Sequence, residues 1–316
     1  MSYIAFLDLV GTREAALISS QHYSKNIDLF AKSLKEIGNE YKCSIYGYSD
    51  NAYIEVENLY EMLKLFGELR EKLRRSHIYF TAAVDKGTLN AKSHKINKAT
   101  GNIMTFENPS TAEIYKLQTE FQGVGYTISK AVCDDLKKEN LENSVKPSAF
   151  ECISKETSSS ELIPIMDLAY DRIGCVQLKY VIIDYLKTMV MNARAARYYI
   201  TPIITMIKSY DTERLEHDLD ELVKTITFQN IPKSFINSSL ETHKMLFVFS
   251  LIDYLLSMEE GLESTNIELC QQIIRTSNIP VEHYVKIIAK TSDSIISRLN
   301  KHEFIKILYD YDSENI

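Results

Sequence analysis

The sequence is poor in the residues that characterise disulfide-rich, fibrous or zinc-finger proteins. It contains no tryptophan, ten glycines, six prolines and five cysteines among its 316 residues. The cysteines lie far apart, with no CxxC pair and no zinc-type spacing to histidine, so a disulfide framework and a zinc site are both disfavoured. A hydrophobic content of 45% and a charged content of 25% are instead typical of a globular chain, long enough for one large domain or two ordinary ones.

Long apolar runs and an excess of positive charge are also missing. The longest apolar stretch, Met245 to Met258, is too short to span a bilayer and contains Asp253. The apolar run Tyr3–Leu9 has no basic segment before it, so it predicts a buried strand rather than a signal peptide. The net charge of −7 argues against a nucleic-acid backbone as the main partner. We therefore expect a cytoplasmic protein with no membrane span and no nucleic-acid partner.

Strand and helix patterns alternate over residues 1–153. Short apolar or β-branched runs predict strands at 3–9, 42–49, 52–56, 77–84, 103–106, 125–128 and 150–153. Helical spacings predict helices near 27–37, 59–73, 108–118 and 129–139, the third capped by Asn108 and the fourth by Ser129. Asp50-Asn51 suits a hairpin tip, and the polar residues 90–101 predict a loop. This order predicts an α/β sandwich with an inserted hairpin.

The composition changes after residue 153. Ser154–Ser160 is the best linker by composition, and residues 161–316 show helical spacings with few glycines, which predicts an all-α C-terminal region. We expect its helices near 176–208, 211–227, 238–260, 266–276 and 281–309. Within the first of these, Asn192–Tyr199 is basic and aromatic; packing between helices explains it, and a partner groove is the alternative. No chemistry is assigned to this half.

Two acidic residues of the first half stand out by their positions. Asp8 lies near the end of an apolar strand, and Asp50 lies at the predicted hairpin tip. An ionised carboxylate in such a strand is costly unless it is paired or metal-bound, and two divalent cations would remove the repulsion between two neighbouring carboxylates. The segment Leu9, Val10, Gly11 and Thr12 would then lead into a helix N-terminus that suits a triphosphate. Alternatively, Asp8 pairs with a buried lysine and Asp50 is an ordinary turn residue.

These segments resemble the class III nucleotidyl (adenylate and guanylate) cyclase homology domain. Phe6-Leu7-Asp8-Leu9-Val10-Gly11 is similar to that family's F-x-D-[IL]-x-G motif, and Ser49-Asp50 follows 42 residues later where the family has Gly-Asp. The resemblance covers residues 1–153 and implies a ferredoxin-like α/β sandwich. It also implies that Asp8, the Leu9 carbonyl and Asp50 hold two Mg²⁺ or Mn²⁺ ions, and that a homodimer forms the site at its interface.

Tyr46 stands four positions before Asp50, where the family places its base-selecting residue. Purine cyclases carry lysine or glutamate there, whereas a tyrosine resembles the bacterial Pycsar pyrimidine cyclases of anti-phage defence. The resemblance thus implies cyclic CMP or cyclic UMP made from CTP or UTP as a second messenger. Tyr46 as a core aromatic is the alternative interpretation, and Tyr48, on the same strand face, is the second candidate for base contact.

The resemblance has one gap that bears on activity. Asn108 matches the start of the family's Asn-x-x-x-Arg pair, but Ala112 stands where the arginine would be. Charge that develops on the α-phosphate needs a donor, for which Lys86, Lys92 and Lys95 are candidates. Three functions therefore remain open from the sequence: a pyrimidine cyclase, a purine cyclase, and an inactive cyclase-fold module that acts through its helical half.

Overall fold

The computed structural model describes residues 2–12, 19–95, 102–120, 123–139, 160–163, 176–191 and 196–208, and a few isolated positions besides these. The chain divides into two compact units, Met1–Gly174 and Cys175–Ile316. This division falls later than the predicted linker at 154–160.

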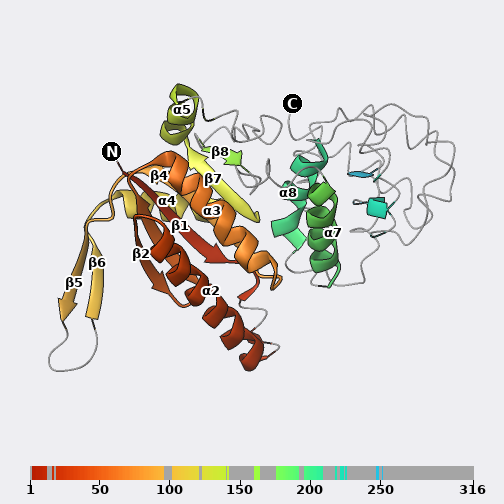
Figure 1. Ribbon diagram of the computed structural model, residues 1–316, viewed down its shortest axis with the longest axis horizontal. Coiled ribbons are helices and arrows are strands. Elements are labelled where there is room, and N and C mark those ends of the chain that lie inside the picture. Colours follow the sequence, from red (N-terminus) through yellow and green to blue (C-terminus); the bar gives the residue numbers. More distant parts are fainter. Residues whose placement is uncertain are drawn as a thin grey trace, which may run out of the picture. The chain divides into compact units, whose positions relative to one another are not determined.

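The first unit is built on a six-stranded mixed sheet (Figure 1). Strand β1 (Tyr3–Leu9) lies in its interior, antiparallel to β3 (Asn51–Val56) on one side and to β4 (Phe80–Lys86) on the other. The edge strand β2 (Cys43–Tyr48) forms a hairpin with β3. Helix α2 (Ser20–Glu40) connects β1 to β2, and α3 (Leu59–Arg74) connects β3 to β4. These elements form the β-α-β-β-α-β arrangement of ferredoxin-like folds, which confirms the predicted α/β sandwich.

The sheet continues beyond β4 with a parallel strand. Strand β7 (Gly125–Ser129) runs parallel to β4, and β8 (Ser160–Ile163) pairs with β7 in antiparallel orientation. Helix α4 (Ser110–Glu120) lies between β4 and β7 in the chain, and α5 (Lys130–Lys138) follows β7. Ser129 caps α5 as predicted, accepting a hydrogen bond from the Val132 N–H at 3.3 Å.

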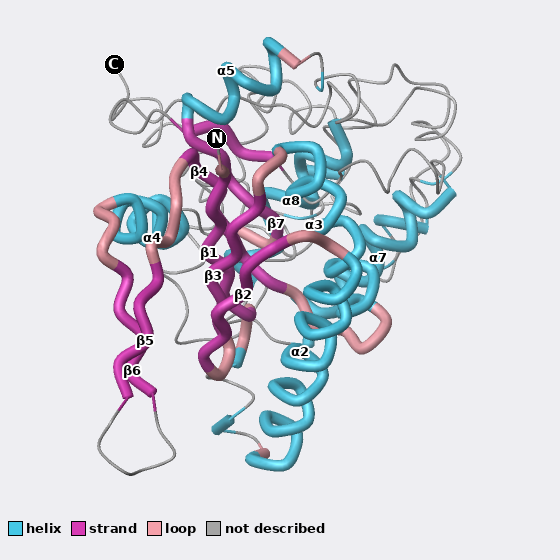
Figure 2. Tube along the Cα trace, turned by 60° about the vertical axis from the view of Figure 1, so that its left-hand side comes forward, coloured by secondary structure: helices cyan, strands magenta, loops and turns pink. Residues whose placement is uncertain are grey.

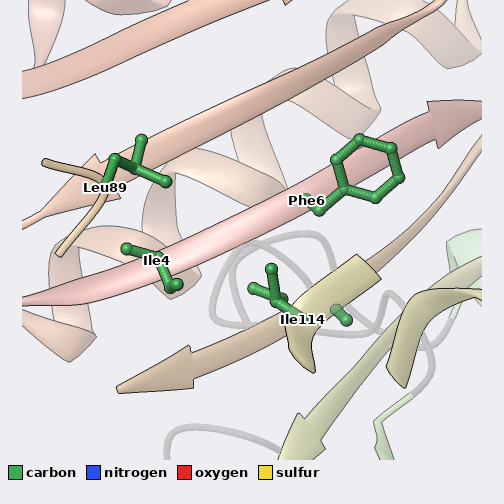
Figure 3. Packing of buried hydrophobic residues seen from close by; sticks show 5 residues of the cluster. Ile4, Phe6, Leu89 and Ile114 are labelled. Atoms are coloured by element: carbon green, nitrogen blue, oxygen red, sulfur yellow. The ribbon is translucent and has the colours of Figure 1, made fainter. Parts of the chain in front are cut away.

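Different helices cover the two faces of the sheet (Figure 2). On the face covered by α2 and α3, Phe66 of α3 stacks on Tyr126 of β7, with ring centroids 5.1 Å apart. On the opposite face, Ile114 of α4 packs with Ile4 and Phe6 of β1 (Figure 3). Because successive side chains of a strand point to opposite faces, Asp8 belongs to the α4 face together with these two β1 residues.

Residues 90–101, predicted to be a loop, contain a strand. Strand β5 (Ala91–Lys95) pairs with β6 (Asn102–Phe106) in a separate two-stranded sheet. The hairpin projects beside the main sheet in Figure 2. The prediction was wrong because Ala-Lys-Ser-His-Lys has no apolar alternation, and this strand is defined by its partner rather than by burial of one face.

Three other boundaries differ from the predictions. The strand predicted at 77–84 begins at Phe80, because His77 adopts a turn conformation with a φ of 55°. The predicted strand 150–153 lies outside the described residues, whereas β8 occupies positions assigned to the end of the linker and the start of the helical region. The first helix after β1 with described bounds is α2, and only Thr12, Ala16 and Leu17 are described as helical before it.

The second unit contains two described helices where one long helix was predicted at 176–208. Helix α7 (Val176–Met191) and α8 (Ala196–Lys208) contact each other, with the rings of Tyr185 and Tyr199 5.5 Å apart. Lys179 of α7 pairs with Asp218 and Glu221. The other predicted helices lie largely or wholly outside the described residues. Among the described helices, none is long and apolar enough to cross a membrane.

Candidate metal and nucleotide site

Asp8 lies at the end of β1 with a strand on each side. It is in register with Asn51 of β3 and with Thr81 of β4. The carboxylate is half-buried, in contrast to the buried apolar side chains that fill the rest of the strand. The apolar strand thus presents one acidic group, at its carboxyl end.

Asp50 belongs to the two-residue turn between β2 and β3, as the predicted hairpin tip requires. Its carbonyl oxygen accepts a hydrogen bond from the Leu9 N–H at 2.8 Å, which ties the turn to the residue after Asp8. Its carboxylate oxygen Oδ2 accepts a hydrogen bond from the Thr12 hydroxyl at 2.7 Å. The structure therefore brings together the two carboxylates that the sequence separates by 42 positions.

The two carboxylates repel each other electrostatically. Burial and, second, the charge of Asp50 raise the pKa of Asp8 to about 6. The backbone amide of Leu9 offsets part of this rise. No salt bridge joins either aspartate to a lysine, arginine or histidine within the described part of the chain. The site therefore carries excess negative charge that a bound cation would neutralise.

The donor set fits hard divalent cations. Carboxylate oxygens are the ligands that Mg²⁺ and Mn²⁺ prefer, and such ions usually keep water or substrate oxygens for their other positions. Among the described residues, no group of three or more histidine, cysteine or acidic side chains lies together, so a cation here would have only two carboxylate ligands from the chain. A pair of carboxylates with a nearby backbone carbonyl, such as that of Leu9, suits ions that also bind a triphosphate.

In the segment after Asp8, some backbone amides already donate hydrogen bonds within the fold. The Leu9 N–H donates to Asp50, and the Val10 N–H donates to the Tyr79 carbonyl at 2.9 Å. Gly11 has a φ of 78°, a left-handed conformation that glycine adopts without steric cost. Of the four residues predicted to face the phosphates, Leu9 and Val10 thus already use their amides, and the remaining amides belong to Gly11 and Thr12.

Tyr46 lies in an aromatic cluster on the same face of the sheet as Asp8. It is half-buried, and its ring meets the edge of Phe106 with a centroid separation of 5.5 Å. Tyr53, its cross-strand partner, packs on Phe6 and Phe106. Tyr48 also contacts Phe106 and is 41% exposed. This packing agrees with the alternative interpretation of Tyr46 as a core aromatic, and base selection by Tyr46 stays a prediction.

Asn108 is the helix cap that its sequence context predicted. Its side-chain oxygen accepts hydrogen bonds from the Ser110 N–H at 3.0 Å and from the Ser110 hydroxyl at 2.9 Å. Its amide nitrogen donates to the Thr88 hydroxyl at 3.3 Å. Both ends of the amide are therefore engaged within the subunit, and contact between Asn108 and a substrate stays a prediction.

Two of the candidate lysines have carboxylate partners. Lys86 binds Asp135 of α5, and its strand register places it opposite Tyr3, at the other end of β1 from Asp8. Lys92 pairs with Glu107 at 2.6 Å on an exposed part of the β5–β6 hairpin. For Lys95 only the backbone is described. The structure thus assigns Lys86 to a structural ion pair and leaves the transition-state donor unassigned.

Two side chains support the Asp50 turn in ways that the sequence does not predict. Thr12, expected to face the phosphates, directs its hydroxyl at Asp50. The hydroxyl of Tyr23 in α2 lies 2.9 Å from that of Ser49, the residue before Asp50. Neither contact joins residues that are adjacent in the sequence, so no local pattern could have revealed them.

Comparisons with known proteins give structural likeness without sequence likeness. No family model and no curated protein matches the chain. The adenylyl cyclase CyaB from P. aeruginosa superposes with a TM-score of 0.36 and 10% identity, over 43% of this chain and 80% of that one. The guanylyl cyclase Cya2 superposes with a TM-score of 0.39 and 11% identity, over 51% of this chain and 88% of that one. At these scores the case for a function rests on the geometry of the site.

Proposed function

We propose that this protein is a metal-dependent nucleotide cyclase that converts CTP or UTP into the 3′,5′-cyclic monophosphate and pyrophosphate. The observation that carries the proposal is the pair Asp8 and Asp50, held together at one end of the sheet without a cationic partner among the described residues. As a second messenger, the product would serve anti-phage defence.

In the proposed reaction the ribose 3′-oxygen attacks the α-phosphorus, the bond from that phosphorus to the bridging oxygen breaks, and the 3′-hydroxyl proton passes to solvent. Two divalent cations would activate the 3′-hydroxyl and neutralise charge on the phosphates. Asp8, Asp50 and the Leu9 carbonyl would hold these cations. The backbone amides of Gly11 and Thr12 would contact the triphosphate, and Tyr46 or Tyr48 would contact the base.

The proposal includes a homodimer with the site at its interface. Its support is the α4 face of the sheet, where Tyr48 and, on α4 itself, Tyr115 are 41% and 52% exposed. Large aromatic side chains of this kind are enriched in protein interfaces. A partner subunit placed there would bring its Asn108 region near the first subunit's carboxylates. Monomeric protein would then be inactive.

One experiment tests both turnover and base choice. Purified protein is incubated with each of ATP, GTP, CTP and UTP in the presence of Mn²⁺, and the product is identified by mass spectrometry. We expect cyclic CMP or cyclic UMP. A purine product would refute the pyrimidine assignment, and Tyr46→Lys and Tyr46→Glu then test whether Tyr46 influences base choice at all.

A catalytically inactive cyclase-fold module is the second candidate. The observation that favours it is the engagement of Lys86 by Asp135 and of Lys92 by Glu107, which leaves no assigned donor for the charge on the α-phosphate. Under this alternative none of the four nucleotides is converted, and the protein acts through its second unit. Absence of product from all four, with the protein folded and Mn²⁺ present, would establish it over the cyclase.

A further inference from the structure

The turn that carries Asp50 needs support from outside the hairpin. It consists of only Ser49 and Asp50, at the end of the edge strand β2. Its tie to β1 is the hydrogen bond from the Leu9 N–H to the Asp50 carbonyl at 2.8 Å, which leaves the Asp50 side chain to be held by other contacts. Repulsion between the carboxylates favours any movement of the turn away from β1. Contacts that keep Asp50 in place must therefore come from other parts of the chain.

Thr12 supplies one such contact. Its hydroxyl donates to Asp50 Oδ2 at 2.7 Å across 38 positions of sequence, in a half-buried setting. A hydrogen bond to an ionised carboxylate is stronger than one between neutral groups. It occupies one of the two carboxylate oxygens and fixes the direction of the other, so the carboxylate keeps a free oxygen for a cation.

Tyr23 supplies a second contact through Ser49. Ser49 has a φ of 49°, a left-handed conformation that costs a non-glycine residue about 1 kcal/mol. Its hydroxyl lies 2.9 Å from the hydroxyl of Tyr23, which is half-buried on α2. A glycine would adopt this conformation more easily but could not make the contact. Ser49 therefore accepts an unfavourable backbone conformation, and its hydroxyl links the turn to α2.

We infer that Thr12 and the Tyr23–Ser49 pair are positioning residues that hold the Asp50 carboxylate beside Asp8 before a cation binds. The inference rests on the proposed function, since it takes the two aspartates to be the metal ligands. It also connects the N-terminal part of α2 to the proposed metal site, through the contact of the Tyr23 hydroxyl with Ser49. The metal chemistry itself does not require this connection. The residues act through Asp50 and do not themselves touch the reacting atoms.

The test measures Mn²⁺ binding without nucleotide, by the electron paramagnetic resonance signal of free Mn²⁺. Thr12→Val keeps the side-chain shape and removes the hydroxyl, Thr12→Ser keeps the hydroxyl, and Tyr23→Phe removes one oxygen atom. Tyr60→Phe is the matched control, because Tyr60 is a 41% exposed tyrosine on α3. Asp50→Asn gives the level of binding without the second ligand. Thermal unfolding in EDTA is recorded for every variant.

We expect the dissociation constant for Mn²⁺ to rise about three- to tenfold in Thr12→Val and about two- to threefold in Tyr23→Phe, as the loss of one hydrogen bond predicts. Thr12→Ser and Tyr60→Phe should remain within twofold of the wild type. The melting temperature in EDTA should fall only modestly, as expected for the loss of one hydrogen bond, and the loss of affinity distinguishes positioning from a purely structural role, which would leave the affinity unchanged.

Two results would overturn the inference and are distinguishable. If Thr12→Val and Tyr23→Phe bind Mn²⁺ like the wild type while Asp50→Asn does not, the positioning role is wrong and the proposed metal site stands. If the wild type binds no more Mn²⁺ than Asp50→Asn, no preformed site exists, and both the inference and the metal pair of the proposed function fail.

Discussion

A partly buried aspartate lies near each end of β1, yet the two aspartates differ in their partners. At the Tyr3 end, Asp135 of α5 accepts a hydrogen bond from the Tyr3 hydroxyl at 2.8 Å and binds the ammonium group of Lys86. Burial alone would raise the pKa of Asp135, but these partners outweigh it and hold the pKa below its usual value. At the other end, Asp8 faces Asp50, and its pKa is raised.

This difference sets an internally paired cluster apart from the pair that we propose as the metal site. The Asp135 cluster has its own cation and needs nothing from outside the chain, so it contributes to folding. The Asp8–Asp50 pair has no cationic partner among the described residues, and the mutual repulsion of its carboxylates opposes folding. Under the proposed function, the pair would instead contribute by binding a cation.

The largest expected effect is on turnover. Asp50→Asn should lower product formation by at least about 100-fold, because loss of a metal ligand removes several kcal/mol of transition-state stabilisation. Asp135→Asn is the matched control at the other end of β1 and should retain activity. Product formed per minute from the preferred nucleotide is the measurement. Equal losses in both variants would contradict the separation of roles.

The second effect is on stability, and it concerns the Tyr3 end of β1 rather than the Asp8 end. Asp135→Asn should lower the free energy of unfolding by about 1–2 kcal/mol, because Lys86 loses a partner in a setting where its side chain is only 28% exposed. Urea denaturation followed by circular dichroism measures the change, and Mn²⁺ affinity should be unaltered. A variant as stable as the wild type would show that the ion pair contributes nothing.

The smallest effect concerns the pH dependence of the metal-free protein. Because the pKa of Asp8 is raised in the folded state, folding favours its protonated form, and stability from this group is lost as pH rises from about 4 through 6. Asp8→Asn removes the charge, so in EDTA at pH 7.5 it should be more stable than the wild type by about 1 kcal/mol, after allowance for solvent screening.

The wild type and Asp8→Asn should have the same stability at low pH. Below pH 4 the Asp8 carboxyl is protonated in both the folded and the unfolded state, so the difference from Asp8→Asn should vanish. Urea titrations at pH 4, 5, 6 and 7.5 give the profile. A difference in stability that does not depend on pH would show that the substitution acts through packing rather than through charge.

Sequence patterns predicted the elements that bury a face. The run Tyr3–Leu9, the hairpin tip at Asp50 and the Leu59–Leu73 stripe each have a local signature, and each lies where it was expected. The sequence did not predict β5, which is polar, or β8, which has only four residues and directly follows a serine-rich segment. Both strands are defined by their pairing partners. Local pattern carries no information about such pairing.

The site was predictable to the same degree. The two aspartates could be found because acidic groups in an apolar strand and at a hairpin tip are unusual. The hydrogen bond from the Asn108 amide nitrogen to Thr88 and the packing of Tyr46 against Phe106 join residues far apart in the sequence, so only the structure reveals them. The contact between Ser49 and Tyr23 likewise joins residues that are 26 positions apart, whereas the left-handed backbone of Ser49 follows from the two-residue hairpin turn itself.

The hairpin register has a consequence for synthesis of the chain. Asp8, Thr12, Tyr23, Ser49 and Asp50 all lie within the β1–α2–β2–β3 segment, which ends at Val56, whereas β7 and β8 pair more than 65 residues later. Contacts close in sequence form early, and a chain leaving the ribosome releases its N-terminal part first. The acidic pair can therefore assemble while the far half of the sheet is still being translated.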